Sequence, residues 1–211
     1  MPFPMRVRTS RSSRARYRAR ADAIETTRHT LEQARKLKAE NHSTLFNVGL
    51  YLLLLDQDLA DFTHNVIWAT GDHKRAFVTK HEAILIYEAA KDLPQLLGRD
   101  FREAGKELKL SDAQLARLNA VSSELSKFWQ RHREFLGGIR NTLAAHRDKD
   151  AIGYLREVEQ LKPLEVMERA AELSAGLQRL VKVLTEIAFA TAGPAAILED
   201  MLVSGRKKRA G

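Results

Sequence analysis

The spacing of apolar residues along the chain predicts helices. In residues 44–69 they recur every three or four positions, as in Leu45, Val48 and Leu52, which places them on one face of a helix. Residues 164–190 show the same spacing over a comparable length. No stretch sustains the alternation of apolar and polar residues that predicts a strand. The expected fold class is therefore all-α.

Local signals predict where further helices begin and end. We expect one helix over 22–40 and another over 75–92, ending before Pro94 because the residue preceding a proline resists helical geometry. Ser111-Asp112-Ala113-Gln114 fits a capping box, which opens a long helix toward His146. Together these segments predict a bundle of four to five long helices.

Size and composition limit the class of protein. The chain has 211 residues, of which 44% are hydrophobic and 29% charged, as expected for one globular domain with tails. It has no cysteine, which excludes disulfides, thiolate metal sites and cysteine nucleophiles. The longest apolar run, 48–55, is far shorter than the roughly 18 residues that a membrane span needs. We therefore expect a cytoplasmic protein with no membrane partner.

The net charge of +8 is concentrated at the two ends of the chain. Residues 1–20 carry seven arginines and no acidic residue, and residues 206–209 are Arg-Lys-Lys-Arg, which leaves residues 21–205 at −3. We expect a disordered basic tail over 1–20, a helical domain over 21–192, and a C-terminal tail over 193–211. Such tails suit nucleic acid or anionic lipid. A merely solubilising end or a mitochondrial presequence are the alternatives.

Few residues suggest chemistry. The sequence has no glycine-rich phosphate loop and no His-Glu-x-x-His pattern. No two of the seven histidines have the spacing of a helical metal pair with a carboxylate nearby, so no metal site is expected. His64 lies on an apolar helix near Asp61 and Asn65, and we interpret it as a hydrogen-bonded structural histidine.

One segment near the end of the long central helix combines several informative residues. Arg140 is followed at once by Asn141 and, after five intervening residues, by His146. Gly137-Gly138 precedes this arginine, Ala144-Ala145 precedes the histidine, and an Arg-Asp-Lys-Asp run follows it. The segment resembles the active-site motif of the HEPN superfamily of helical ribonucleases, especially its branches linked to abortive infection and toxin–antitoxin loci.

The resemblance implies a specific function. The domain would be HEPN-like and would act as a metal-independent endoribonuclease in bacterial antiviral defence or a toxin–antitoxin system. It would need no cofactor, act on RNA, and carry a composite Arg/His site at a homodimer interface, with an antitoxin protein as a further partner. The alternative is a non-catalytic HEPN-like module that binds RNA or protein in such a system.

Side-chain chemistry suggests a role for each motif residue. Histidine ionises near working pH, so His146 is the candidate general base or acid. Arginine has a permanent charge and a fixed fork of donors, so Arg140 is the candidate clamp on the scissile phosphate. Asn141 would orient either the histidine or the arginine side chain. Arg133 and Arg147 share a helix face with Arg140 and are the candidate RNA-binding residues.

Helix geometry favours a site shared between two chains. Six positions along a helix turn through about 600°, which leaves Arg140 and His146 about 120° apart around the axis. The two side chains can meet at one phosphate more easily if they come from the two chains of a symmetric dimer. Gly137 and Ala144 are small and would let the partner helix approach. A structural alternative is that Asp148 and Asp150 pair with Arg147 and Arg140. The bare arginine–histidine spacing also occurs at Arg75 and His81.

Overall fold

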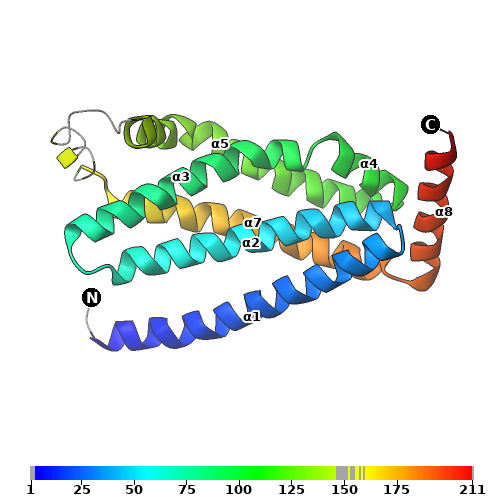
Figure 1. Cartoon of the computed structure of the whole chain (residues 1–211), viewed down its shortest axis with the longest axis horizontal. Helices are drawn as coiled ribbons and strands as arrows, with labels where there is room; N and C mark the ends of the chain where they lie inside the picture. Colours follow the sequence, from blue (N-terminus) through cyan, green and yellow to red (C-terminus); the bar gives the residue numbers. More distant parts are fainter. Residues whose placement is uncertain (1–2, 146–151, 153–154, 157, 159, 211) are drawn as a thin grey trace.

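The computed structural model describes the backbone of residues 3–145, 152, 155, 156, 158 and 160–210. Side chains are described for residues 14–141, 152, 155, 156, 158 and 160–202. The described residues form seven helices and contain no strand, which confirms the all-α fold class (Figure 1). The helices are α1 (Phe3–Lys36), α2 (Glu40–Trp68), α3 (Asp72–Leu96), α4 (Arg99–Glu107), α5 (Asp112–Ala145), α7 (Pro163–Thr191) and α8 (Pro194–Ala210).

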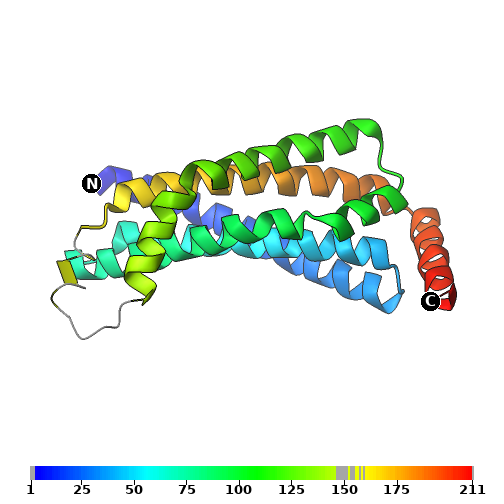
Figure 2. The same ribbon diagram turned by 90° about the horizontal axis from the view of Figure 1, so that it is seen from above.

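The body of the molecule is a bundle of α2, α3, α5 and α7, which lie side by side (Figures 1 and 2). α1 packs along the outside of α2, and the short α4 also contacts α2. α8 crosses the end of the bundle at which α1 ends and α2 begins (Figure 1). All five expected long helices are present, as α1, α2, α3, α5 and α7.

The core consists of the apolar faces that the sequence pattern predicts. Leu52 of α2 and Leu173, Leu177 and Leu180 of α7 are fully buried in one continuous cluster. The helices approach closely there, because a Cβ built at Gly176 of α7 would lie 2.7 Å from a methyl carbon of Leu125 on α5. Burial of these faces is the main source of stability in such a bundle.

The capping box is confirmed, whereas the expected helix end before Pro94 is wrong. The backbone N–H of Ser111 donates to the Gln114 side chain at 2.9 Å, and the Gln114 N–H donates to the Ser111 hydroxyl at 3.3 Å. α3 runs through Pro94 to Leu96. The proline lies in the last turn, where its missing N–H costs one hydrogen bond, and the N–H of Leu97 still donates to the Leu93 carbonyl at 3.0 Å.

Residues 3–20, expected as a disordered tail, continue α1 as helix. Arg20 supplies a reason, because its Nε donates to the buried Asp56 carboxylate of α2 at 2.6 Å. The apolar spacing also gave no indication of α4, which buries Phe101 and Ala104 although it has only nine residues.

α8, which lies in the expected C-terminal tail, is joined to α2 by a buried polar contact. Asp200 of α8 lies 2.7 Å from Nδ1 of His42 and accepts the His42 backbone N–H at 3.0 Å. The Asn41 side chain donates to the same carboxylate at 2.7 Å. Nε2 of His42 lies 3.0 Å from the Thr191 carbonyl at the end of α7. One carboxylate and one imidazole thus join three helices.

No single helix within the described residues combines the length and apolar character needed to cross a membrane. α7 and the segment 194–202 reach those values only as a pair, with a bend of 90° between them.

Candidate functional site

Arg140 lies close to the end of α5, where α3 holds it from one side. Its Nε donates to the Glu88 carboxylate at 2.7 Å, and its Nη1 donates to the Asn141 side-chain oxygen at 3.3 Å. The guanidinium carbon lies 5.3 Å from the ring centroid of Tyr87, within the range of a cation–π contact. α3 therefore fixes the direction in which the arginine points.

The ion pair at Arg140 is only partly covered. The side chains of Arg140 and Glu88 are 40% and 38% exposed. The hydrogen bond from Arg140 holds the pKa of Glu88 below its ordinary value, so this carboxylate remains charged at neutral pH. Glu88 thus orients the arginine but also offsets part of the positive charge that would attract a phosphate.

Gly137, expected to admit a partner helix, faces α3 of the same chain. A Cβ built on it would lie 3.3 Å from a ring carbon of Tyr87. The absence of a side chain at Gly137 thus makes room for the ring on which Arg140 rests. α5 also changes direction in its last part, which crosses the end of the bundle (Figure 2). Glycine pairs such as Gly137-Gly138 are common where helices bend.

The structure places three of the five expected site residues. Arg133, Arg140 and Asn141 all belong to the last part of α5, and Arg133 is exposed. His146 and Arg147 lie outside the described residues, as do Asp148 and Asp150. The pairing of Asp148 and Asp150 with Arg147 and Arg140 stays a prediction.

The second arginine–histidine match is engaged within its own helix. Arg75 donates to Asp72 at 3.0 Å, and Nδ1 of His81 lies 2.8 Å from the Phe77 carbonyl. The ring of His81 also packs on that of Phe77, with centroids 4.3 Å apart. Both side chains therefore have local structural roles.

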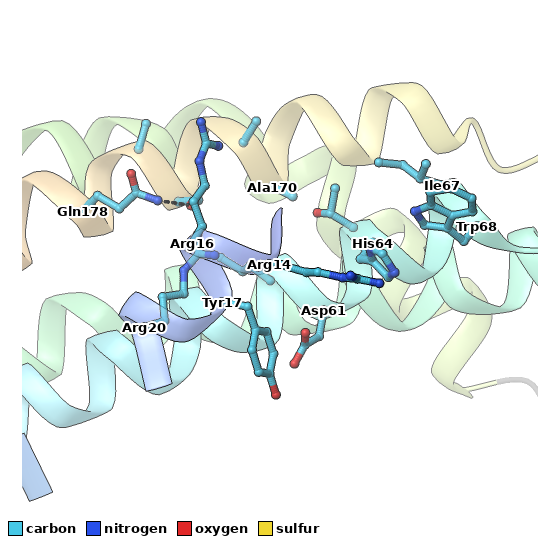
Figure 3. Close-up of a pocket in the computed structure, with 16 residues that line it drawn as sticks. Arg14, Arg16, Tyr17, Arg20, Asp61, His64, Ile67, Trp68, Ala170 and Gln178 are labelled. Atoms are coloured by element: carbon cyan, nitrogen blue, oxygen red, sulfur yellow. Dashed lines mark hydrogen bonds between the residues drawn. The ribbon is translucent and has the colours of Figure 1, made fainter. Parts of the chain in front are cut away.

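A pocket that the sequence did not predict lies between α1, α2 and α7 (Figure 3). Its volume is about 780 Å³. Six of its lining side chains are basic or aromatic: Arg14, Arg16, Tyr17 and Arg20 from α1, and His64 and Trp68 from α2. Ser174 and Gln178 of α7 close the opposite wall.

A buried carboxylate organises the inner end of this pocket. Asp56 accepts hydrogen bonds from Arg20 at 2.6 Å, from the Ser174 hydroxyl and from Gln178 at 3.3 Å. These contacts join α1, α2 and α7 through one side chain, whose exposed fraction is 5%. Arg20 is thus partly neutralised, and its aliphatic stem forms a wall of the pocket.

A second carboxyl group is hydrogen-bonded to a residue that lines the pocket. Glu82 of α3 is fully buried and accepts a hydrogen bond of 2.6 Å from Thr63, which lines the pocket. Burial raises the pKa of Glu82, and the hydrogen bond from Thr63 offsets only part of that effect. The balance leaves the pKa of Glu82 above its ordinary value.

His64 is a surface residue, not the structural histidine that we expected. It is exposed, lines the pocket, and its ring centroid lies 5.9 Å from that of Trp68 (Figure 3). The structural histidine is instead His42, whose exposed fraction is 1%. Among the described residues, no group of three histidine, aspartate or glutamate side chains is arranged to hold a metal ion.

The pocket has one signal in the sequence, which is weaker than the apolar stripes. Tyr17 interrupts the run of arginines, and Arg16 and Arg20 are four residues apart, which places them on one side of a helix. In a helical segment this spacing gives a basic face, although like charges so placed repel each other and do not themselves favour the helix.

Comparison with protein-family models, with curated proteins and with solved structures found no match to the chain. The resemblance to HEPN proteins therefore stays a prediction, which rests on the motif around Arg140 and His146 and loosely on the all-helical pattern.

Proposed function

We propose that the chain is a metal-independent endoribonuclease of a bacterial defence or toxin–antitoxin system. In this proposal Arg140, Asn141 and His146 form the catalytic site, completed by a second copy of the chain in a homodimer. The observation that supports it best is the state of Arg140. Its guanidinium is oriented by Tyr87 and Glu88, remains 40% exposed, and lies on the last turns of α5 before His146.

The proposed chemistry needs a proton acceptor and an anion clamp. His146 takes the proton from a ribose 2′-hydroxyl, whose oxygen then attacks the adjacent phosphorus. The 5′-oxygen of the next nucleotide leaves and receives a proton, which gives a 2′,3′-cyclic phosphate and a 5′-hydroxyl. A guanidinium has five N–H donors, of which Arg140 uses two with Glu88 and Asn141. Three remain to bind the charge that develops on the phosphate.

Exposed apolar residues support the proposed dimer. Several flank the motif in sequence and belong to the region in which α5 ends and α7 begins: Phe135 at 36% exposure, Ile152 at 65%, Leu155 at 40% and Leu164 at 73%. Large apolar side chains that are exposed in the free chain are often buried when a partner binds. A second copy that covered it would lie next to Arg140, as a composite site requires.

The test is RNA cleavage in EDTA, with the molecular mass measured on the same samples. We expect wild-type dimer to cleave RNA and His146→Ala to be inactive. Arg140→Lys should lower the rate by about 10²-fold or more, because an ammonium lacks the planar fork of donors. The matched control is Arg117→Lys, since Arg117 also lies on α5 and pairs with a glutamate, Glu186, on a neighbouring helix. Its rate should equal that of the wild type.

Three results would contradict the proposal. They are cleavage that survives His146→Ala, equal cleavage of a 2′-deoxy substrate, or an active monomer. The second candidate function is a module that binds RNA without cleaving it, and the arginine-rich pocket between α1, α2 and α7 favours it. RNA binding by a wild-type protein that never cleaves would select that function.

A further inference from the structure

The pocket between α1, α2 and α7 has the charge of an anion-binding site. It is lined by three arginines, with Asp61 as the acidic residue of its described lining. Asp56 engages Arg20 at 2.6 Å, whereas Arg14 and Arg16 form no ion pair within the part of the chain that the structure describes. Both are exposed, so they can reach a phosphate without losing an existing partner.

The same pocket offers flat aromatic surfaces beside these charges. Tyr17 is 52% exposed and Trp68 38% exposed, and the ring of His64 packs against that of Trp68. In Figure 3 the side chain of Arg14 extends along the pocket toward His64, and Tyr17 lies beside the arginines on the same helix. Cationic and aromatic side chains therefore line the same pocket.

This combination fits one class of ligand better than a simple anion. Proteins that bind single-stranded nucleic acid pair a basic groove, which follows the phosphates, with aromatic side chains on which bases stack. Arginines alone would suffice for free phosphate or an acidic peptide, and neither ligand uses exposed aromatic rings in this way. A recess bounded by three helices also suits an unpaired strand more than the face of a lipid bilayer.

We propose that this pocket binds a segment of single-stranded RNA. Arg14 and Arg16 contact phosphates, and Tyr17, with His64 and Trp68, stacks on bases. The site rests on the proposed function only for the choice of RNA as the nucleic acid, and it does not require that the protein cleave its ligand. It also gives the basic start of α1 a specific role in holding the strand.

The test is fluorescence anisotropy with a labelled oligouridylate of about 12 nucleotides, a length within the usual site size of such proteins. All variants carry His146→Ala, so that the probe stays intact. We expect Arg14→Gln with Arg16→Gln to reduce the salt dependence of binding by about 1.4 in log–log slope, because each lost single-strand contact removes about 0.7. Tyr17→Ser should weaken binding about 5-fold or more.

Each variant has a matched control. Arg18→Gln with Arg102→Gln removes two charges at exposed positions outside the pocket. Phe77→Ser removes an aromatic ring whose exposed fraction, 52%, equals that of Tyr17. Both controls should bind like the parent protein, with equal helicity of all proteins verified by circular dichroism. Controls that lose as much affinity as the pocket variants would overturn the proposed site.

Two further outcomes would reassign the pocket. If Tyr17→Ser binds normally and inorganic polyphosphate competes as well as RNA, the pocket is an anion site and the stacked strand is wrong. If the pocket variants lose binding to phosphatidylserine vesicles but keep RNA binding, its ligand is a lipid surface. Cleavage is measured separately. If the protein binds RNA through the pocket but does not cleave it, only the proposed function is refuted. If the protein cleaves RNA and the pocket variants bind it normally, only this site is refuted.

Discussion

At the scale of single residues, the contact between His42 and Asp200 places an imidazole and a carboxylate in the interior, where the two residues are 1% and 3% exposed. The carboxylate receives hydrogen bonds from the backbone and side chains of both Asn41 and His42. Burial by itself raises the pKa of Asp200, but these hydrogen bonds outweigh it and leave the pKa below its ordinary value. The folded protein therefore prefers the charged form of this side chain.

This preference predicts a loss of stability in acid. A carboxyl group with a lowered pKa in the folded state stabilises the protein above the pKa of the unfolded chain, about 3.9, and that contribution disappears as the pH falls through the lowered value. We expect Asp200→Asn to lower the free energy of unfolding at pH 7 by about 1–3 kcal/mol. It should also flatten the decline below pH 4, as measured by urea denaturation across pH.

Asp22→Asn is the control for this experiment, because Asp22 is an exposed aspartate in α1. Its stability and pH dependence should match those of the wild type. A variant at Asp200 that retains the full acid dependence would show that other carboxylates cause it.

The same residues show where prediction from sequence stops. His42 and His64 both lie on α2, and the polar neighbours of His42, which are Asn41, Ser43 and Thr44, gave no sign that it is the buried one. The difference arises from Asp200, which is 158 positions away from His42 along the chain. Likewise, the structural alternative for Arg140 named carboxylates nearby in sequence, whereas Glu88 holds it from another helix, 52 positions away.

At the scale of helices, two glycines illustrate opposite constraints. A Cβ at Gly176 would lie 2.7 Å from Leu125, whereas a Cβ at Gly138 would have no neighbour within 4 Å. We expect Gly138→Ala to raise the free energy of unfolding by about 0.5–1 kcal/mol, because alanine restricts the unfolded chain and favours helix. Gly176→Ala should lower it by about 1–2 kcal/mol, since overpacking exceeds that gain.

Chemical denaturation of the two variants tests this pair directly. If Gly176→Ala also stabilised the protein, Leu125 would be free to move and the α5–α7 contact would be looser than described. Both substitutions replace glycine by alanine inside a helix, so the gain in helix propensity is the same for both. The difference in stability between the two variants therefore reports on packing.

Helices were the part of the structure best predicted from sequence. Long apolar stripes specify α2 and α7 because burial of one face dominates their stability, and the capping box specifies the start of α5 because its hydrogen bonds are local. α4 was missed because nine residues hold too few apolar positions to show a period. The end of α3 was misplaced because a proline in the last turn is compatible with helix.

At the scale of the whole molecule, α1 is a long helix that lies on the outside of the bundle. It packs chiefly on α2, and its middle is held by the contact between Arg20 and Asp56. Arg20→Met leaves a buried carboxylate without its cation, so we expect the unfolding free energy to fall by about 1–3 kcal/mol. Hydrogen exchange should accelerate in α1 well before it does in α7.

The double variant Arg20→Met, Asp56→Leu provides the control. Replacing both partners by apolar groups removes the unpaired charge, so most of the lost stability should return. Equal acceleration of exchange in α1 and α7 by Arg20→Met would mean that the contact supports the whole bundle and does not act on α1 alone.

The candidate site was predicted in part, for physical reasons. Arg140 and Asn141 were found because they are adjacent in a short motif, and the structure brings them into hydrogen-bond contact. The pocket was missed because it joins α1, α2 and α7, which are separated along the chain and meet only after folding. Four of its lining residues, Arg14, Arg16, Tyr17 and Arg20, also belong to the segment that was expected to be a disordered tail.

The placement of α1 and α8 determines how far apart the two basic segments of the chain are held. α1 begins at one end of the bundle and α8 crosses the other (Figure 1). A helix of 34 residues, such as α1, is about 50 Å long. If the two basic segments bind the RNA of the proposed function, an oligonucleotide shorter than that span would contact one segment at a time, and only a longer strand would gain affinity from both.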